Sequence, residues 1–201
     1  GYLEDGYDNT GKIKFKDLNK DGVISDADKT YIGNPNPNFI YGFNSAMSYK
    51  NFEFTVFIQG SQGNDLFNIS SVNNYTYGLG LNMTKDVYLN HWTPNNPNAK
   101  YPLPSVKTSL RVSNRFIEDG SYLRFKDIKL AYNLPVPKFK VNWIRNIQLY
   151  ASGQNLITLT KYSWWDPEVN SAGSANSTSQ GLDYHSYPSA KSITFGIRVG
   201  F

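Results

Sequence analysis

The ten residues SITFGIRVGF, Ser192–Phe201, alternate strictly between apolar side chains and small or polar ones. One face of the extended segment carries Ile193, Phe195, Ile197, Val199 and Phe201, and the other carries Thr194, Gly196, Arg198 and Gly200. Because successive side chains of a β-strand point to opposite faces, this pattern predicts a two-faced strand. Its length suits a strand of a soluble sandwich and also a transmembrane strand, which needs about 9–11 residues. Taken alone, the segment leaves both interpretations open.

Composition removes several classes of protein. The 201 residues include 20 Lys and Arg against 16 Asp and Glu, without a basic run of the kind that marks a nucleic-acid site. There is no cysteine, which excludes disulfide frameworks and cysteine-bound zinc. No apolar stretch approaches the roughly 18 residues of a membrane helix. A membrane β-barrel remains possible, because its strands hide their apolar half by alternation.

Four further segments alternate in the same way. They are Phe39–Tyr49, Phe52–Gly60, Tyr122–Asn133 and Trp143–Gln154, and Tyr122–Asn133 contains a one-residue slip near Lys126 and Asp127 that predicts a β-bulge. The links after the first and third strands are short, whereas those after the second and fourth are long. Consecutive antiparallel strands place these two kinds of link at opposite ends, as in outer-membrane barrels. We therefore expect an all-β chain whose antiparallel strands form part of a transmembrane β-barrel; five strands are too few to close one.

Residues 1–38 are polar and contain a candidate calcium loop, DLNKDGVISDAD, at Asp17–Asp28. Its expected ligands are the side chains of Asp17, Asn19, Asp21, Ser25 and Asp28 and the backbone carbonyl of Val23. Calcium requires six to eight hard oxygen ligands around a tight turn, and Gly22 permits that turn. Asp rather than Glu at the last position resembles dockerin-type loops. Since no long helices flank the loop, we expect structural Ca²⁺ rather than a calcium sensor.

Possible ligand contacts are the aromatic residues Tyr162, Trp164 and Trp165, which cluster in a long connection. Aromatic faces stack on sugar rings, although packing within the loop is the commoner reason for such a cluster. His91 and His185 lie far apart in the sequence and have no nucleophile motif nearby. The sequence therefore predicts no catalytic residues and no enzyme.

Several long stretches resemble, in the same order, the SusC/RagA-like TonB-dependent transporters of Bacteroidetes outer membranes. They are FKDLNKDGVISDADKTYIGNPNPNFIYGFN at Phe15–Asn44, FIQGSQGNDLFN at Phe57–Asn68, EDGSYLRFKDIKLAYNLP at Glu118–Pro135, ASGQNLITLTKYSWWDPEV at Ala151–Val169 and YPSAKSITFGIRVGF at Tyr187–Phe201. The resemblance covers essentially the whole chain and implies the C-terminal portion of a 22-stranded barrel. Trp164 departs from the family pattern, which has a smaller residue there.

This resemblance implies a domain organisation, a location and partners. Residues 1–38 would be an extracellular loop with the calcium motif, and residues 39–201 would be the C-terminal barrel segment. The protein would lie in the outer membrane, in contact with its lipid, and import glycans or peptides. Its partners would be a SusD-like lipoprotein and, through a part absent from this chain, TonB. The alternative from the residues alone is a secreted, calcium-stapled β-sandwich that binds glycans.

Overall fold

The computed structural model describes residues 1–72, 82–105, 111–135, 143–171 and 180–201. The chain forms two compact units. The first, here called the loop unit, comprises Gly1–Asn36, Asn64–Asp119 and Val169–Ser186; the second, the sheet unit, comprises Pro37–Gly63, Gly120–Glu168 and Tyr187–Phe201. Within the described ranges, no helix has both the length and the apolar character needed to cross a membrane.

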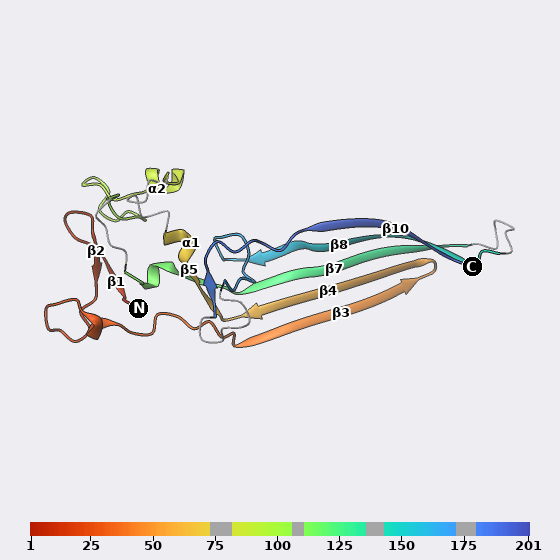
Figure 1. Cartoon of the computed structure of the whole chain (residues 1–201), viewed down its shortest axis with the longest axis horizontal. Coiled ribbons are helices and arrows are strands. Elements are labelled where there is room, and N and C mark those ends of the chain that lie inside the picture. Colours follow the sequence, from red (N-terminus) through yellow and green to blue (C-terminus); the bar gives the residue numbers. More distant parts are fainter. Residues whose placement is uncertain (73–81, 106–110, 136–142, 172–179) are drawn as a thin grey trace. The chain divides into compact units, whose positions relative to one another are not determined.

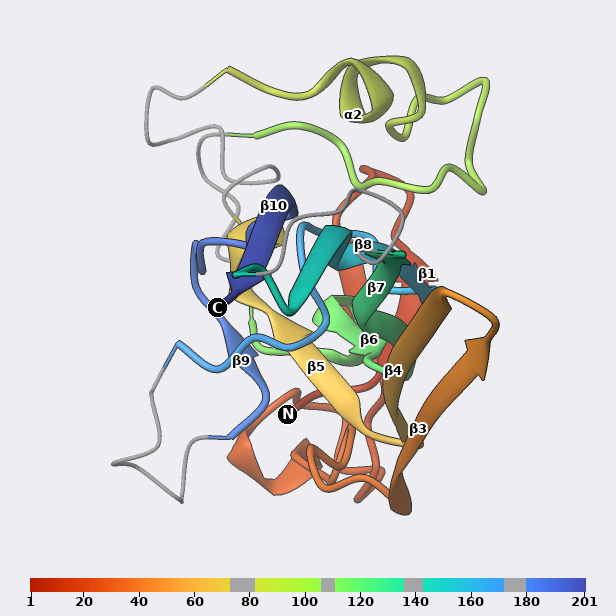
Figure 2. The same cartoon turned by 90° about the vertical axis from the view of Figure 1, so that its right-hand side faces the viewer.

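The sheet unit is one antiparallel sheet of five long strands (Figures 1 and 2). In chain order these are β3 (Phe39–Tyr49), β4 (Phe52–Gln62), β7 (Tyr122–Leu134), β8 (Asn146–Thr160) and β10 (Ser192–Gly200). Each pairs with the strand that precedes it in this series, so the sheet order is β10-β8-β7-β4-β3. The prediction of consecutive antiparallel strands is confirmed. The described sheet is open, with β3 and β10 at its edges.

Strand boundaries differ from the sequence prediction mainly in β8, which was expected at 143–154. The strand begins three residues later, because Trp143 lies in a turn, and continues to Thr160. Asn155, with φ of +52°, occupies the left-handed region that asparagine tolerates better than most residues. This left-handed residue interrupts the alternation of apolar and polar side chains, so a prediction based on that alternation ends the strand too early.

The strand register collects the apolar positions on one face of the sheet. Across the five strands, Met47 pairs with Phe54, Phe54 with Leu130, Leu130 with Ala151 and Ala151 with Phe195. Thirteen residues on this face are exposed although they are large and apolar: Phe39, Phe43, Met47, Tyr49, Phe52, Leu130, Leu149, Ile157, Leu159, Ile193, Phe195, Ile197 and Val199. The two-faced character predicted from the alternation therefore extends across the whole sheet.

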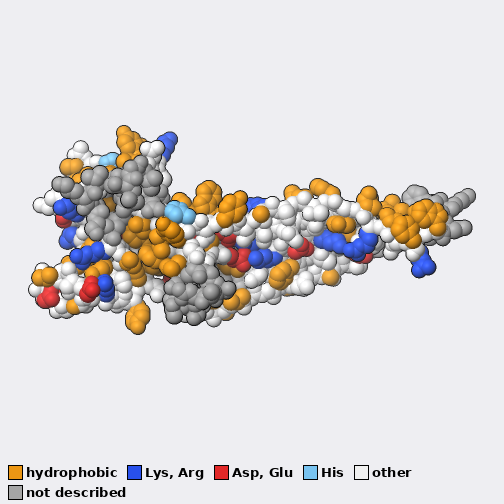
Figure 3. All heavy atoms as spheres, in the orientation of Figure 1, with side chains coloured by type: hydrophobic (Ala, Val, Ile, Leu, Met, Phe, Trp, Pro, Cys, Tyr) orange, Lys and Arg blue, Asp and Glu red, His pale blue; other side chains and the backbone are white. Residues whose placement is uncertain are grey.

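The opposite face of the sheet is mostly polar, with Ile40 and Phe57 as exposed apolar exceptions. Its cross-strand rows include Gln59, Arg124 and Thr158, then Thr55, Lys129, Ser152 and Thr194, and finally Asn133, Gln148 and Arg198. Glu53 accepts hydrogen bonds from Asn133 Nδ2 at 2.7 Å and Gln148 Nε2 at 3.1 Å, which satisfies its carboxylate without a cation. Acidic and basic side chains lie next to one another along the sheet in Figure 3.

The predicted β-bulge is confirmed in β7. The β4 pairing passes from Phe57 opposite Asp127 to Ile58 opposite Phe125, which leaves Lys126 without a partner on that strand. On the other side, the register with β8 shifts at the same place, between Phe125 and Asp127. The extra residue keeps Phe125 and Ile128 on the same apolar face, because it restores the alternation after the slip.

The loop unit contains short elements held by long-range pairing. They are β1 (Glu4–Tyr7), β2 (Ile13–Phe15), η1 (Asp26–Asp28), β5 (Asp65–Asn68), α1 (Ile69–Val72), α2 (Lys85–Leu89), η3 (Asn114–Phe116), β6 (Ile117–Asp119) and β9 (Leu182–Asp183). β1 pairs with β2, and a three-stranded sheet has the order β6-β5-β9. The sequence predicts a short strand at Lys12–Lys16, which is β2, and a helix from about Asn82 to His91, where the structure has the shorter α2.

Candidate functional site

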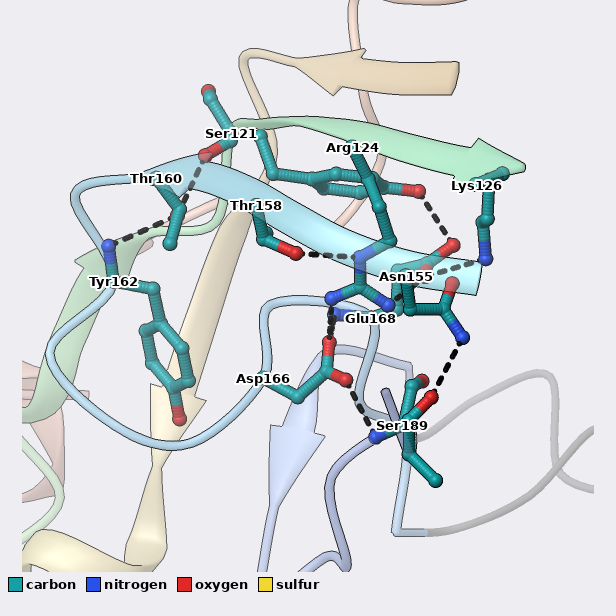
Figure 4. A network of polar contacts seen from close by, with 12 residues as sticks. Ser121, Arg124, Lys126, Asn155, Thr158, Thr160, Tyr162, Asp166, Glu168 and Ser189 are labelled. Carbon is teal, nitrogen blue, oxygen red and sulfur yellow. Dashed lines mark hydrogen bonds and ion pairs between the residues drawn. The ribbon is translucent and has the colours of Figure 1, made fainter. Parts of the chain in front are cut away.

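A buried group of charged side chains lies on the polar face of the sheet unit (Figure 4). Arg124 projects from β7, and its guanidinium donates to Asp166 Oδ1 at 2.5 Å, to Glu168 Oε2 and to Thr158 Oγ1 at 2.9 Å. The side chains of Arg124 and Asp166 are only 3% and 4% exposed. Charged groups this deeply buried require partners, and Arg124 has three. The arrangement fixes the connection that follows β8 onto the sheet.

Lys126, at the bulge of β7, is a second cation of this group. Lys126 Nζ lies 2.7 Å from Glu168 Oε2, and Tyr122 also donates its hydroxyl proton to Glu168 at 2.7 Å. Residues 124 and 126 would share a face of any regular strand. The bulge lets Asp127 occupy that face as well, since a bulge changes the direction of the side chains that follow it. Two cations then balance the two carboxylates Asp166 and Glu168.

Asp166 connects two segments that are distant in the sequence. Burial by itself would raise the pKa of Asp166, but hydrogen bonds from Arg124 and from the backbone N–H groups of Glu168 and Ser189 lower it below the ordinary value. The two backbone bonds measure 2.9 Å and 2.8 Å. The carboxylate is therefore ionised at neutral pH and holds the segment before β10 against the segment after β8.

Next to this group lies a pocket of about 440 Å³. Its lining includes Asn155, Thr158, Trp165, Asp166, Tyr187 and Lys191, all from the sheet unit. The volume falls within the range of about 300–1,000 Å³ that is usual for ligand pockets. Thr158 Oγ1 accepts from Arg124, and Asn155 Nδ2 donates to Ala190 O at 3.1 Å, so the polar lining is held in place from within.

The three predicted ligand contacts have different surroundings. Tyr162 is buried, Trp164 is half-buried, and Trp165 is 70% exposed and lines the pocket. The two tryptophan rings meet edge to face, with centroids 6.0 Å apart. Trp164 Nε1 is buried and has no hydrogen-bond partner among the described residues. Trp165 is thus the member of the three that a ligand could reach; ligand contact itself stays a prediction.

The predicted calcium loop folds around its own oxygen atoms. The carboxylate of Asp17 accepts from Lys20 N at 2.6 Å and from Gly22 N at 2.7 Å, and Asp21 Oδ1 accepts from Val23 N at 2.8 Å. Gly22 has a φ of +84°, in the region that favours glycine. Asn19 Oδ1 accepts from Asp21 N at 3.1 Å. These turns present hard oxygens of the type that calcium prefers.

Asp28, the last residue of this loop, is buried, whereas the other loop carboxylates are half-buried or exposed. Asp28 is fully buried and accepts from Leu18 N and Ser25 N, both at 2.8 Å, and the Ser25 bond is the chief reason that its pKa is lowered. Ser25 caps the short helix η1 through Ala27 N. Within the part of the chain that the structure describes, no three His, Cys, Asp or Glu side chains are gathered as a metal site. The donor types fit calcium, and occupancy stays a prediction.

The loop unit has a second ionic cluster beside a larger cavity. Arg115 Nε lies 2.9 Å and 2.8 Å from the two oxygens of Glu4, and Arg115 also donates to Tyr7 Oη and to the carbonyl of Lys100. The adjacent cavity of about 650 Å³ is lined by these residues and by Trp92, among others. Because Glu4 and Arg115 neutralise each other, the cluster stabilises the unit and presents no net charge to a ligand.

Asp86 forms a third polar centre, at α2. Hydrogen bonds from Lys100, Tyr101 and Asn90 lower the pKa of Asp86 to about 2. Lys100 Nζ lies 2.8 Å from Asp86 Oδ2. This carboxylate joins the short helix to the segment around residue 100, which otherwise has little regular structure.

Sequence reasoning missed Arg124 and Tyr187 as parts of the site. From the sequence, Asp166 or Glu168 could serve a hydrolase only if a second carboxylate met it in space, and nothing in their spacing argues for that. They do converge, but on a cation, which holds both as acceptors of fixed hydrogen bonds. One feature of the sequence could have indicated this site. The alternation of β7 places Arg124 on the polar face of the strand, where a carboxylate partner is needed if the arginine is buried.

The sheet is antiparallel and two-faced, its long connections lie at one end, and a charged group holds one of these connections. Together, these features are those of a segment of a β-barrel wall. By sequence, the chain is 39% identical to the TonB-dependent receptor P3 of Formosa agariphila over 98% of its length and 29% identical to the TonB-dependent receptor SusC of Bacteroides thetaiotaomicron over 97%. The chain is thus a relative of the SusC/RagA-like TonB-dependent receptors, as the sequence resemblance implied. It spans only about a fifth of these two proteins' own lengths.

Solved structures agree with this assignment. The chain superposes over its whole length on the RagAB peptide transporter with a TM-score of 0.83 at 26% identity, and on the RagAB peptide importer in the open-open state with a TM-score of 0.79 at 27% identity. It covers 22% of each of those chains. No family model matches the sequence. These relatives are named as receptors, importers and transporters rather than as enzymes.

Proposed function

We propose that the chain is the C-terminal part of the barrel of a SusC/RagA-like, TonB-dependent transporter in the outer membrane. The carrying observation is the continuous apolar face shared by β3, β4, β7, β8 and β10. Soluble monomers rarely expose contiguous apolar patches larger than a few hundred Å². Lipid is the environment in which exposed side chains such as Phe43, Phe195 and Ile197 are stable.

The polar face supports the same proposal. A barrel lumen is wet, so charged residues are tolerated there, whereas an arginine facing lipid at the midplane costs about 2–4 kcal/mol. Arg124, Lys129 and Arg198 all lie on the polar face of the sheet. The unpaired edges of β3 and β10 would pair with further strands of the transporter, because no open sheet edge is stable in lipid.

We extend the proposal to partners and cargo. The transporter would import glycans or peptides, work with a SusD-like lipoprotein and receive energy through TonB. Support comes from similarity to SusC and to RagAB, the latter described as a peptide importer. The chain itself would form part of the barrel wall and its loops, and it would contribute no catalytic residues.

The test is made on the full-length gene product. It should fractionate with the outer membrane, and a strain that lacks it should lose uptake of one glycan or peptide class while retaining growth on simple sugars. Recovery of the protein in the soluble extracellular fraction would favour a secreted β-sandwich and defeat the transporter proposal.

We also propose that the loop at Asp17–Asp28 binds one structural Ca²⁺ ion. Asp17, Asn19, Asp21, Ser25, Asp28 and the carbonyl of Val23 would supply its oxygen ligands. The two positive charges of the ion would offset most of the charge of the three carboxylates, and the ion would fix the loop, because binding to the folded form alone stabilises that form. Support lies in the hard-oxygen donor set and in the turn at Gly22.

Calorimetry of the full-length protein with CaCl₂ or with EDTA tests this proposal. Calcium should raise the Tm of the wild type, and Asp21→Asn should remove most of that increase. Asp8→Asn is the matched control, because Asp8 also accepts hydrogen bonds from Thr10 and Lys12 in an exposed turn but lies outside the loop. Equal calcium effects in both variants would exclude the assigned site.

A further inference from the structure

Two strongly exposed aromatic side chains line the pocket on the polar face of the sheet unit. Trp165 is 70% exposed and Tyr187 is 92% exposed, and both belong to the lining of the 440 Å³ pocket. Large aromatic residues usually bury most of their area, since each can bury about 150–250 Å². Two of them exposed at one pocket form an apolar surface that a bound ring would cover.

Both aromatic residues emerge from segments that the same carboxylate holds. Trp165 directly precedes Asp166, which is fixed by Arg124, and Tyr187 lies two residues before Ser189, whose backbone N–H donates to Asp166 Oδ2 at 2.8 Å. Prolines at positions 167 and 188 stiffen the two segments further. The aromatic pair is therefore held in position before any ligand arrives, which reduces the entropy lost on binding.

Polar groups beside the aromatic pair have both donor and acceptor capacity. Thr158 Oγ1 accepts from Arg124 and retains its own proton, while Asn155 donates through Nδ2 and retains its carbonyl oxygen. Lys191 adds an ammonium group to the lining. A sugar ring matches this set, because its C–H face packs on an aromatic ring while its hydroxyls both donate and accept hydrogen bonds.

An extended peptide fits the same pocket less well. Peptides commonly add a strand to an exposed sheet edge. The strands that line the pocket, β7 and β8, are interior strands that are paired on both sides, whereas the open edges are β3 and β10. The backbone donors and acceptors that a peptide would use are thus already satisfied within the sheet.

We infer that the pocket lined by Trp165 and Tyr187 is a contact site for a pyranose ring of a glycan. The inference rests on the proposed transporter function, since the pocket lies on the face assigned to the lumen. It assigns Tyr187 as a ligand contact beside Trp165, and it assigns Asp166 as the positioning residue for both.

Binding of the full-length protein in detergent to an array of purified plant, algal and microbial polysaccharides, printed beside soluble oligopeptides, tests the inference. Wild type should capture at least one polysaccharide. Trp165→Ala and Tyr187→Ala should each weaken that capture about tenfold, the loss expected for one aromatic contact. Trp165→Phe retains a ring and should retain most of the capture.

Matched controls are Trp143→Ala and Tyr31→Ala. These side chains are 65% and 99% exposed and lie outside the pocket, so their removal should leave capture unchanged. Capture of peptides alone, capture of nothing, or equal capture by the pocket variants and wild type would overturn the inference. Fractionation of the same strains separates the two claims. A protein in the outer membrane with unaffected pocket variants refutes only the glycan contact, whereas a protein absent from the outer membrane refutes the proposed function.

Discussion

Replacing Arg124 by methionine removes the cation that joins two carboxylates while retaining a side chain of similar length. The variant loses charge-assisted bonds to Asp166 and Glu168, each worth roughly 1.5–3 kcal/mol, and one bond to Thr158. Asp166 would keep two backbone N–H donors, and Glu168 would keep Lys126. Because these donors partly satisfy both carboxylates, we expect the lower end of the cost of breaking a buried pair, about 3 kcal/mol.

This loss should appear first as local opening of the connection after β8. Hydrogen exchange of the full-length protein reports it directly, since the amides of Glu168 and Ser189 donate to Asp166. A loss of about 3 kcal/mol would accelerate exchange at these two amides about a hundredfold.

Arg198→Met is the matched control, because Arg198 lies on the same face of the sheet on β10 and contacts neither carboxylate. The double variant Arg124→Met/Asp166→Asn should lose less than the sum of the single variants, by about 1–2 kcal/mol. Exchange at both amides within about threefold of wild type in Arg124→Met would refute the clamping role.

Three further changes have defined outcomes. The pKa of Asp166 is lower in the folded state than its ordinary 3.8, so its stabilisation is complete above that value and is lost as the pH falls through the lowered pKa. Protection of the Ser189 amide, expressed relative to its intrinsic exchange rate at each pH, should therefore fall in acid, and an Asp166→Asn variant should lack that fall. Phe195→Arg should cost about 2–4 kcal/mol if its face meets lipid, whereas Thr194→Arg should cost far less, as judged by urea unfolding in lipid vesicles. Gly60→Ala should reduce folding yield, because a Cβ there would lie 2.2 Å from the Tyr41 ring and 2.6 Å from a backbone carbonyl; wild-type yield would contradict this packing.

The strands of the sheet unit could be predicted because their information is local. Alternation at Ser192–Phe201 identifies the faces, and the slip at Lys126 locates the bulge; both need only neighbouring residues. The end of β8 was misplaced because Asn155 interrupts the alternation on which the prediction depends.

The site and the loop unit depend on contacts that the local sequence does not encode. Arg124 meets Asp166 across 42 residues, and this contact exists only after the connection folds back onto the sheet. β5 pairs in parallel with β9, which has two residues, too few for any periodicity. The aromatic cluster at 162–165 was visible, but which member is exposed follows from packing, so Tyr162 and Trp165 could not be distinguished.

Spin-label accessibility along β10 measures the two-faced sheet most directly. The chain contains no cysteine, so single cysteines at positions 193–199 can be labelled in the full-length protein once any cysteines elsewhere are replaced. In lipid bilayers, labels at 193, 195, 197 and 199 should meet oxygen dissolved in the membrane, and labels at 194, 196 and 198 should meet a water-soluble nickel reagent. Equal access of the nickel reagent at all seven positions would contradict a lipid-facing barrel strand.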